Sequence, residues 1–258
     1  MGRYKLTLEY DGTRYSGWQI QKGGKSVQGE ITDSCRELFG SSDFELFGAG
    51  RTDSGVHALG QIAHLDVKTD LPLLKLKYGI NDRLPPDITI LNVEEAPDNF
   101  HARHDAVARS YVYQISQRRT AFGKKYVWWI KDILDTEKMA EAASLFTGLN
   151  DFSSFTDPEQ EQKSTKTKII RADIHKKGDL IIFHVIGSHF LWKQVRRMTG
   201  VLVEVGRGNM KPDQIRVLLG RYSEQPAKFT APPSGLFLER VYYKGDVFDE
   251  GYSSLFNI

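Results

Sequence analysis

Residues 168–186, KIIRADIHKKGDLIIFHVI, contain two runs rich in β-branched residues, with the turn residues Gly and Asp between them. Apolar runs of this length bounded by turn residues are typical of a β-hairpin. We therefore predict paired strands at Lys168–Ile174 and Leu180–Ile186, joined by residues 176–179. This hairpin predicts an antiparallel sheet in the C-terminal half of the chain.

The segments on either side of the hairpin carry both strand and helix patterns. Before it, the residues after Arg109 alternate as in a strand, and Asp135–Phe146 has the apolar spacing of a helix. After it, the patterns predict helices at Phe190–Val205 and Asp213–Leu219 and a last strand at Phe237–Tyr242. The C-terminal half therefore mixes helices with an antiparallel sheet.

The first third of the chain shows the same mixture. An alternating strand comes first, and a helix follows between the N-cap residue Ser26 and the stop signal Gly40. In chain order we expect a strand at Arg3–Tyr10, the helix at 27–39, a strand at Phe44–Phe47, a loop at Gly48–Gly60, and strands at Gln61–Val67 and Ile88–Val93.

Both parts of the chain thus contain strands, one main helix and further strands. We predict an α+β protein of two similar halves, residues 1–105 and 106–258, each a mostly antiparallel sheet with helices on one face. No internal repeat is strong enough to prove a duplication.

Composition narrows the class of protein. The 258 residues are 40% hydrophobic and 26% charged, and no apolar run approaches the roughly 18 residues of a membrane span. This composition excludes a disordered or membrane-spanning protein. Cys35 is the only cysteine and the N-terminus lacks a secretory pattern, so we expect a cytoplasmic protein without disulfides or a thiolate metal site.

Charge is distributed unevenly, although the net charge is only +2. Between Lys163 and Lys177 six basic residues face one acidic residue, Asp173. Such a run is either a solvated face or a strip that contacts phosphate, in which case Lys166 and Lys168 are the expected contacts. The seven histidines include no HExxH motif, and we expect neither a metal nor another cofactor.

Residues 48–61, GAGRTDSGVHALGQ, present one carboxylate, Asp53, close to Arg51 in a loop with four glycines. The segment lacks the third glycine of a dinucleotide-binding fingerprint and the Gly-Lys-Ser/Thr of a P-loop. From the residues alone two interpretations stay open. The segment is either an ordinary turn in which Asp53 binds its own backbone, or a flexible loop that presents a reactive carboxylate.

The same string resembles the catalytic-aspartate motif of the tRNA pseudouridine synthase A family. Six further segments resemble the family in its order, and with the aspartate motif they span nearly the whole chain. The sequence departs from the common bacterial pattern at Lys193-Gln194 and at Ser234. The six segments are Tyr10–Gln19, Ser26–Gly29, Phe100–Arg103, Arg109–Tyr113, Phe190–Met198 and Ala231–Leu238.

The resemblance implies an isomerase that converts uridine to pseudouridine in the anticodon stem-loop of tRNA, at positions 38–40. The reaction breaks the N1–C1′ glycosidic bond, rotates the uracil and joins C5 to C1′, and it needs no metal or cofactor. The resemblance also implies a homodimer. Within each chain we expect the sheets of the two halves to join around a central basic cleft. Two other classes remain open, an RNA-binding module without catalysis and a nucleoside N-glycosidase that releases free uracil.

The resemblance also assigns roles to individual residues. Asp53 is the expected catalytic carboxylate, acting as nucleophile at C1′ or as base at C2′. Arg196 is expected to keep that carboxylate ionised, and the ring of Tyr111 to pack on the target base. Without the resemblance, Arg196 is an ordinary surface arginine and Tyr111 an ordinary core residue.

Further residues are expected to bind substrate and RNA. We expect Arg51 to hold the flipped nucleotide, with Leu236 and Phe237 as apolar walls around it. On the helix that carries Arg196, the neighbouring Arg197 is expected to face solvent or phosphate. The predicted RNA contacts are Arg51, His101, Arg103, Lys166, Lys168 and Arg197.

Overall fold

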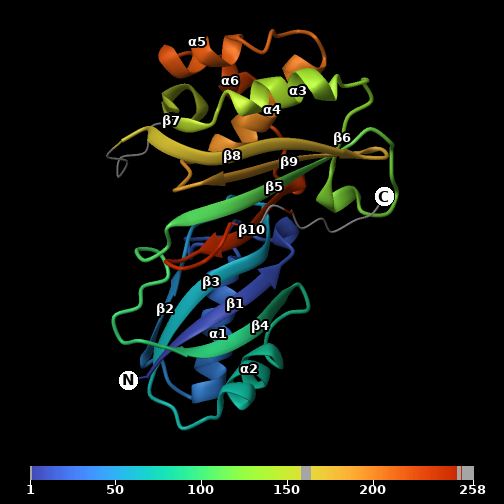
Figure 1. Ribbon diagram of the computed structural model, residues 1–258. Coiled ribbons are helices and arrows are strands. Elements are labelled where there is room, and N and C mark those ends of the chain that lie inside the picture. The colour runs from blue at the N-terminus through green and yellow to red at the C-terminus, as the bar shows by residue number, and fades with distance from the viewer. Residues whose placement is uncertain (1, 158–163, 249–250, 252–258) are drawn as a thin grey trace. The chain divides into compact units, whose positions relative to one another are not determined.

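The computed structural model describes residues 2–157, 164–248 and 251 (Figure 1). These residues form ten strands and six α-helices, which confirms the predicted α+β class. They divide into two compact units, the first containing the described residues up to Val107 with Leu238–Val247 and the second containing those of Ala108–Phe237 together with Phe248. The first unit thus includes residues 106–107 and 238–247 of the predicted second half, 106–258.

The sheet of the first unit has the strand order β4-β1-β3-β10, and β2 also pairs with β3. The β1–β3, β1–β4 and β2–β3 pairs are antiparallel. Helices α1 and α2 contact each other, and Gly79 of α2 lies against Leu38 of α1. The elements are β1 (Gly2–Tyr10), α1 (Val27–Phe39), β2 (Phe44–Gly48), β3 (His57–Val67), α2 (Leu73–Asn81), β4 (Ile88–Ala96) and β10 (Leu236–Tyr242), with a short 3-10 turn at Gly12–Arg14.

Helix α1 follows directly from its sequence. The Ser26 side chain accepts a hydrogen bond from the backbone N–H of Gly29 and caps the first turn. Gly40 ends the helix with a φ of 64°, the left-handed conformation that glycine adopts readily. Val27, Ile31 and Cys35 are four residues apart and fully buried, which places them on one face of the helix.

The first unit differs from the prediction in the start of one strand and in one additional helix. Strand β3 begins at His57 instead of Gln61, and Gly60 lies inside it. A Cβ atom at Gly60 would lie 2.6 Å from the backbone oxygen of Glu239 in β10, so this glycine permits a close approach of two strands. No element was predicted at α2. Only two of its residues, Leu76 and Ile80, are buried, so its buried face is short.

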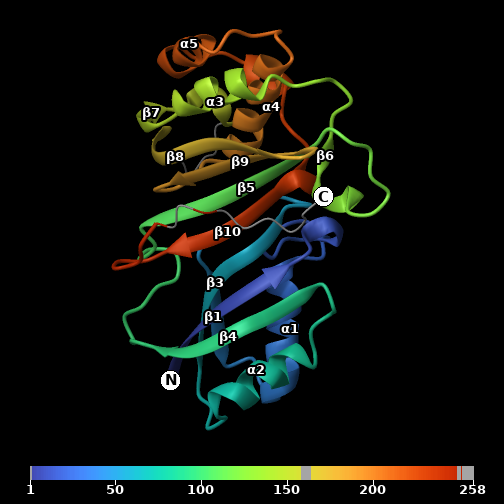
Figure 2. The same ribbon diagram turned by 45° about the vertical axis from the view of Figure 1, so that its right-hand side comes forward.

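The sheet of the second unit has the order β5-β9-β8-β7, and β6 pairs with β5 in parallel. The other pairs are antiparallel, so both sheets are mostly antiparallel, as predicted. Helices α3, α4 and α5 lie on one side of this sheet in both views (Figure 1, Figure 2). The strands are β5 (Ala108–Ser116), β6 (Trp128–Trp129), β7 (Gly148–Asp151), β8 (Lys166–Lys177) and β9 (Leu180–Gly187), and the helices are α3 (Thr136–Ser144), α4 (Gln194–Gly206), α5 (Gln214–Gly220) and α6 (Gln225–Lys228).

The predicted hairpin is confirmed by β8 and β9. Lys177 pairs with Leu180, and Gly178 between them has a φ of 57°. Every residue of β9 is buried, and this strand lies inside the sheet between β5 and β8. No helix among the described residues is both long and apolar enough to span a bilayer.

Helix α4 begins four residues later than predicted, at Gln194 instead of Phe190. Lys193 has a φ of 60°, outside the range of a right-handed helix. The Gln194 side chain accepts a hydrogen bond of 2.8 Å from the backbone N–H of Leu191. This bond holds the segment before α4 in a separate turn, although its apolar spacing continues that of the helix.

Candidate active site

Asp53 lies half-buried in the loop between β2 and β3, and the backbone fixes this loop firmly. The Trp18 N–H donates to the Thr52 carbonyl at 3.2 Å, and the Val56 N–H donates to the Asp53 carbonyl at 3.1 Å. Tyr10 and Thr52 share a buried hydroxyl–hydroxyl hydrogen bond of 2.8 Å. A flexible loop was one of the two interpretations of this glycine-rich segment, and in the structure the loop is bound to the end of β1 and to the turn after it.

Two glycines outside the loop allow this close packing. Gly12 and Gly17 press against the backbone of the Asp53 loop, and an added Cβ would lie 1.9 Å from the Val56 oxygen and 2.4 Å from the Thr52 oxygen, respectively. Gly17 also has a φ of 112°, which side chains other than glycine rarely adopt. The segments Tyr10–Gln19 and 48–61, which resemble the family separately, therefore form one packed structure around Asp53.

Arg51 stands on the same loop with its side chain exposed. The Ala49 N–H donates to the Ile62 carbonyl at 2.7 Å, and the Gln61 side chain donates to the Gly50 carbonyl at 3.1 Å. The backbone on both sides of Arg51 is thus fixed, and its guanidinium is directed from a rigid base into solvent.

In the second unit, the two tyrosines of β5 lie in different environments. Tyr113 is fully buried, and its hydroxyl donates to the Pro232 carbonyl at 2.8 Å. Burial raises the pKa of Tyr113 well above its usual value, and the nearby positive charge of Arg196 acts in the opposite direction. Tyr111 is only half-buried, and Phe190 contacts its ring edge-to-face at 5.1 Å between centroids. Tyr111 is therefore the tyrosine whose ring retains an accessible surface.

Arg196 lies in the first turns of α4, half-buried, and is bound to the segment before β10. Its Nε donates to the Ala231 carbonyl at 2.8 Å, and the Ala231 N–H donates to the Arg196 carbonyl at 3.1 Å. Beyond Ala231, Leu236 and Phe237 are buried at the start of β10. These two reciprocal bonds limit the direction in which the Arg196 side chain leaves the helix.

Arg197 does not face solvent as predicted. Its side chain is almost fully buried and forms an ion pair with Asp157, which also contacts the Lys193 Nζ at 3.2 Å. Burial raises the pKa of Asp157, but the hydrogen bonds from Arg197 and Lys193 outweigh that effect and hold it below its usual value. Arg197 is thus part of the core of this unit, and we no longer expect it to contact RNA.

The predicted RNA contacts of β8 are exposed. Lys166 and Lys168 point outward, whereas Thr167 and Ile169 between and after them are buried, as expected for a strand with one solvated face. Lys163, at the start of the predicted basic strip, lies outside the described residues. Both lysines are therefore placed where phosphate can reach them.

His101 and Arg103 lie in the irregular connection after β4. Arg103 is exposed, while His101 contacts His64 of β3 at 4.7 Å and His104 at 4.2 Å between ring centroids. Burial lowers the pKa of His64 to about 4 and also lowers that of His101, so both rings are neutral at pH 7. Phe47 of β2 stacks on His64 at 5.1 Å, and its side chain is 42% exposed. The sequence did not indicate this aromatic cluster, because its members come from three separate segments.

The chain matches a known family over most of its length. The family described as tRNA pseudouridine synthase matches residues 7–105 and 142–244. The chain belongs to this family. It is similar to tRNA pseudouridine synthase A of Rhodopseudomonas palustris (strain BisA53), with 42% identity over 247 residues that cover 95% of this chain and 100% of the relative. It is also similar to tRNA pseudouridine synthase A of Brucella ovis, with 40% identity over 248 residues that cover 94% and 98%.

Among solved structures, this pseudouridine synthase is remotely similar to the crystal structure of the archaeal box H/ACA sRNP Nop10-Cbf5 complex. The identity is 11% and the TM-score 0.38, over 90% of this chain and 60% of that one. The relatives and the family match establish that the chain is an enzyme that isomerises uridine to pseudouridine in tRNA.

The predicted site residues of this pseudouridine synthase belong to both units. Asp53, Arg51, His101 and Arg103 are in the first unit. The second unit contains Tyr111, Arg196, Leu236, Phe237, Lys166 and Lys168. In the first unit the segment Tyr10–Gln19 contacts 48–61 directly, and in the second unit Phe190–Met198 contacts both Tyr111 and Ala231.

Proposed function

We propose that the enzyme modifies uridines on the 3′ side of the anticodon arm and that Asp53 is the carboxylate that reacts with the ribose. The rigid anchoring of its loop supports this role. A carboxylate that must meet C1′ or C2′ at one distance needs a fixed backbone, since a misplacement of about 1 Å can cost about 10²-fold in rate. The bonds of Thr52 and Val56 provide that fixed backbone.

One carboxylate is enough for this reaction. A retaining glycosidase needs a second carboxyl group because its alkoxide leaving group must be protonated. Uracil leaves instead as a delocalised anion, which can stay in the pocket until C5 bonds to C1′. Asp53 either displaces uracil by bonding to C1′, or takes the proton from C2′ as uracil leaves and returns it when C5 bonds to C1′. In both routes the carboxylate is free again at the end, the C5 proton is lost to solvent and N1 takes up a proton.

Tyr111 is proposed to support the target base. A flipped uracil loses its stacking neighbours, and an aromatic side chain restores about 1–3 kcal/mol per base. The half-buried ring of Tyr111 has one edge held by Phe190, so its orientation is set before substrate binds. The fully buried Tyr113 cannot take this role, because its ring has no accessible surface.

Arg196 is proposed to keep the catalytic carboxylate ionised during the reaction. The bond from its Nε to Ala231 supports this role, because it limits the directions in which the guanidinium can point. A pre-oriented guanidinium loses little side-chain entropy when it meets a carboxylate. Leu236 and Phe237 are proposed to line the same pocket and to exclude water from it.

The proposed RNA contacts are Arg51 and Arg103 in the first unit and Lys166 and Lys168 in the second, with His101 beside Arg103. All four cationic side chains are exposed. Each phosphate contact would add to affinity and to its salt dependence. We further propose that the enzyme works in the cytoplasm as a homodimer, in which two copies combine their basic surfaces on one tRNA. Light scattering of the purified chain would test the dimer.

The test of the proposed reaction is Asp53→Asn, which keeps the size of the side chain but removes its charge and its basicity. We expect single-turnover tritium release from C5-labelled uridine in tRNA to fall to background. Filter binding of tRNA should stay within a few-fold, because phosphates are held by other residues. Asp33→Asn, an exposed carboxylate on α1, is the matched control and should keep full activity.

The outcomes separate this proposal from its alternatives. Residual tritium release by Asp53→Asn would remove Asp53 from the mechanism. Release of free uracil by the wild-type enzyme would indicate an N-glycosidase, and tRNA binding without pseudouridine formation would indicate a binding module. Mapping of the modified positions in tRNA tests the anticodon-arm assignment separately.

A further inference from the structure

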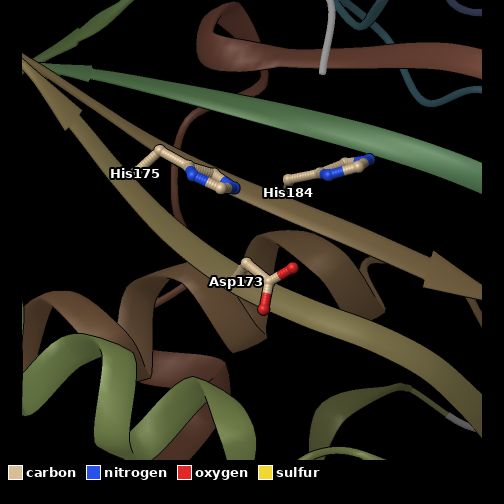
Figure 3. A group of neighbouring side chains, drawn as sticks. All are labelled: Asp173, His175 and His184. Carbon is tan, nitrogen blue, oxygen red and sulfur yellow. The ribbon is translucent and has the colours of Figure 1, made fainter. Parts of the chain in front are cut away.

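Three side chains of the kinds that can bind a metal ion lie on one face of the β8–β9 hairpin (Figure 3). Asp173 and His175 are two residues apart on β8, so both point to the same side of the sheet. His184 on β9 is the register partner of Asp173 across the antiparallel pair. The ligand atoms of the three side chains lie within 4.8 Å of one another. Strand register alone therefore brings this cluster together in the second unit.

We propose that Asp173, His175 and His184 bind one divalent transition-metal ion, with Zn²⁺ as the expected ion. Two imidazole nitrogens and one carboxylate oxygen are a ligand set that suits Zn²⁺, whereas Mg²⁺ and Ca²⁺ prefer oxygen ligands throughout. Three protein ligands leave a fourth tetrahedral position for water. The proposal does not depend on the pseudouridine synthase mechanism.

The cluster is close to the size that such an ion requires. Tetrahedral bonds of about 2.0–2.1 Å place neighbouring ligand atoms roughly 3.3 Å apart. The present atoms lie within 4.8 Å, so they need to approach by about an ångström or less per side chain. Asp173 and His175 are only half-buried and can make this adjustment, whereas His184 is fully buried.

Ser110 on β5 holds the His184 ring in position. Its Oγ lies 2.9 Å from His184 Nε2, so a metal would bind His184 through Nδ1. Histidines that bind metals usually engage their other ring nitrogen in a hydrogen bond, which fixes the tautomer and the ring orientation. The hydroxyl of Ser110 can accept the Nε2–H and thus stabilise the tautomer whose Nδ1 lone pair coordinates. This contact is a second feature, besides the three ligands, that fits a metal site.

The charge of the cluster also fits a dication. The two imidazole rings lie 6.5 Å apart between centroids, and a carboxylate beside them supplies negative charge that a dication can neutralise.

Arg171 provides a competing cation. Its Nε lies 3.6 Å from the Asp173 carboxylate, two residues before it on the same face of β8. In the absence of metal this guanidinium partly neutralises Asp173, and in its presence the two cations repel each other. Removal of Arg171 should therefore strengthen metal binding, while removal of a ligand should weaken it. These opposite effects would locate the ion at the Asp173 carboxylate, and the loss on His175→Gln would show that an imidazole also coordinates it.

The experiment uses the full chain without an affinity tag, stripped with a chelator and titrated with ZnCl₂ in a calorimeter. We expect one Zn²⁺ per chain and a rise in melting temperature of about 5 °C at 100 times the dissociation constant. Asp173→Asn and His175→Gln should weaken binding at least about 100-fold and Ser110→Ala about 10-fold. Arg171→Gln should tighten binding several-fold. His189→Gln removes an exposed histidine of the same unit and is the matched control, with no expected effect.

Several results would overturn the proposal. These are the absence of stoichiometric binding, equal binding by wild-type and Asp173→Asn, or loss of binding in His189→Gln. If a ligand variant fails to fold, the wild-type chain titrated with Co²⁺ still decides the matter. Four-coordinate Co²⁺ with two histidine nitrogens gives intense visible absorption bands, whereas loosely bound six-coordinate Co²⁺ gives only weak ones, and weak bands would contradict the site.

Discussion

The loop that carries Asp53 and the start of α4 are both rigid, but different forces fix them. The Asp53 loop is held by backbone hydrogen bonds and by glycines that let two segments approach closely. The start of α4 is held by charged side chains, namely Arg197 and Lys193 on Asp157. Backbone hydrogen bonds do not titrate. The geometry of the Asp53 loop should therefore change when volume is added beneath it, and the stability of the start of α4 should change when a charge is removed.

The largest effect is expected when volume is added beneath the Asp53 loop. In Gly17→Ala the new Cβ would lie 2.4 Å from the Thr52 oxygen, and the φ of 112° would be strained as well. The loop must then shift, and we expect the single-turnover rate of pseudouridine formation to fall by about 10²-fold or more.

Gly23→Ala is the matched control for this substitution. Gly23 lies in the same connection and has a φ of 78°, but an added Cβ would meet nothing within 4 Å. It therefore carries the backbone strain, about 1 kcal/mol, without the collision. A normal rate in Gly17→Ala, or an equal loss in both variants, would show that close packing does not fix the loop.

The next effect concerns charge at α4. We expect Arg196→Ala to lower turnover by about 10²-fold and to move the acid limb of the pH–rate profile to higher pH, because a carboxylate without a cation is harder to ionise. The profile is the informative measurement, since a purely structural arginine would lower the rate without moving the limb. Arg216→Ala, which removes an exposed arginine of α5, should leave both unchanged.

A smaller effect, on stability, is expected at the neighbouring ion pair. Asp157→Asn leaves the buried Arg197 guanidinium without its counter-charge, and because Asp157 itself is partly exposed we expect a loss of about 2 kcal/mol. For a chain of this length that corresponds to a fall in melting temperature of about 5 °C.

The pH dependence of this stability follows from the lowered pKa of Asp157. A carboxyl group whose pKa is lower in the folded state stabilises the fold at pH values above its unfolded pKa, and this contribution is lost as the pH falls through the folded value. The difference in melting temperature between wild type and Asp157→Asn should therefore be full at pH 7 and shrink below about pH 4. A constant difference down to pH 2 would assign the effect to packing.

The sequence predicted local features well and contacts between distant segments poorly. The cap at Ser26, the stop at Gly40 and the β8–β9 hairpin depend on neighbouring residues, and all three are confirmed. The burial of Arg197 depends on Asp157, 40 residues away along the chain, and the predicted exposure of Arg197 was wrong. The start of α4 was also misplaced, because the apolar spacing continues through the separate turn that ends at Lys193. The apolar spacing of a helix identifies the face that is buried. It does not show whether a charged residue at the edge of that face meets an opposite charge from another part of the chain.

The candidate site shows the same division. Motif resemblance identified Asp53, Tyr111 and Arg196, but not that Gly12 and Gly17 fix the Asp53 loop. A flexible loop was one interpretation because glycine allows many conformations, whereas here glycine allows tight packing. The cluster of Asp173, His175 and His184 was also missed, because its spacing matches no metal-binding motif and only strand register unites it.

The smallest effect is expected at the exposed lysines of β8, which neither packing nor an internal charge network constrains. If Lys166 and Lys168 contact phosphate, replacing both with Ala should weaken tRNA binding and reduce the slope of log affinity against log salt by about 1 for each lost contact. The folded structure should not change, because both side chains lie in solvent. The double variant Lys68→Ala/Lys75→Ala removes two exposed lysines from the first unit and controls for net charge. Equal slopes for the two double variants would mean that tRNA senses only the overall charge, and β8 would then be a solvated face.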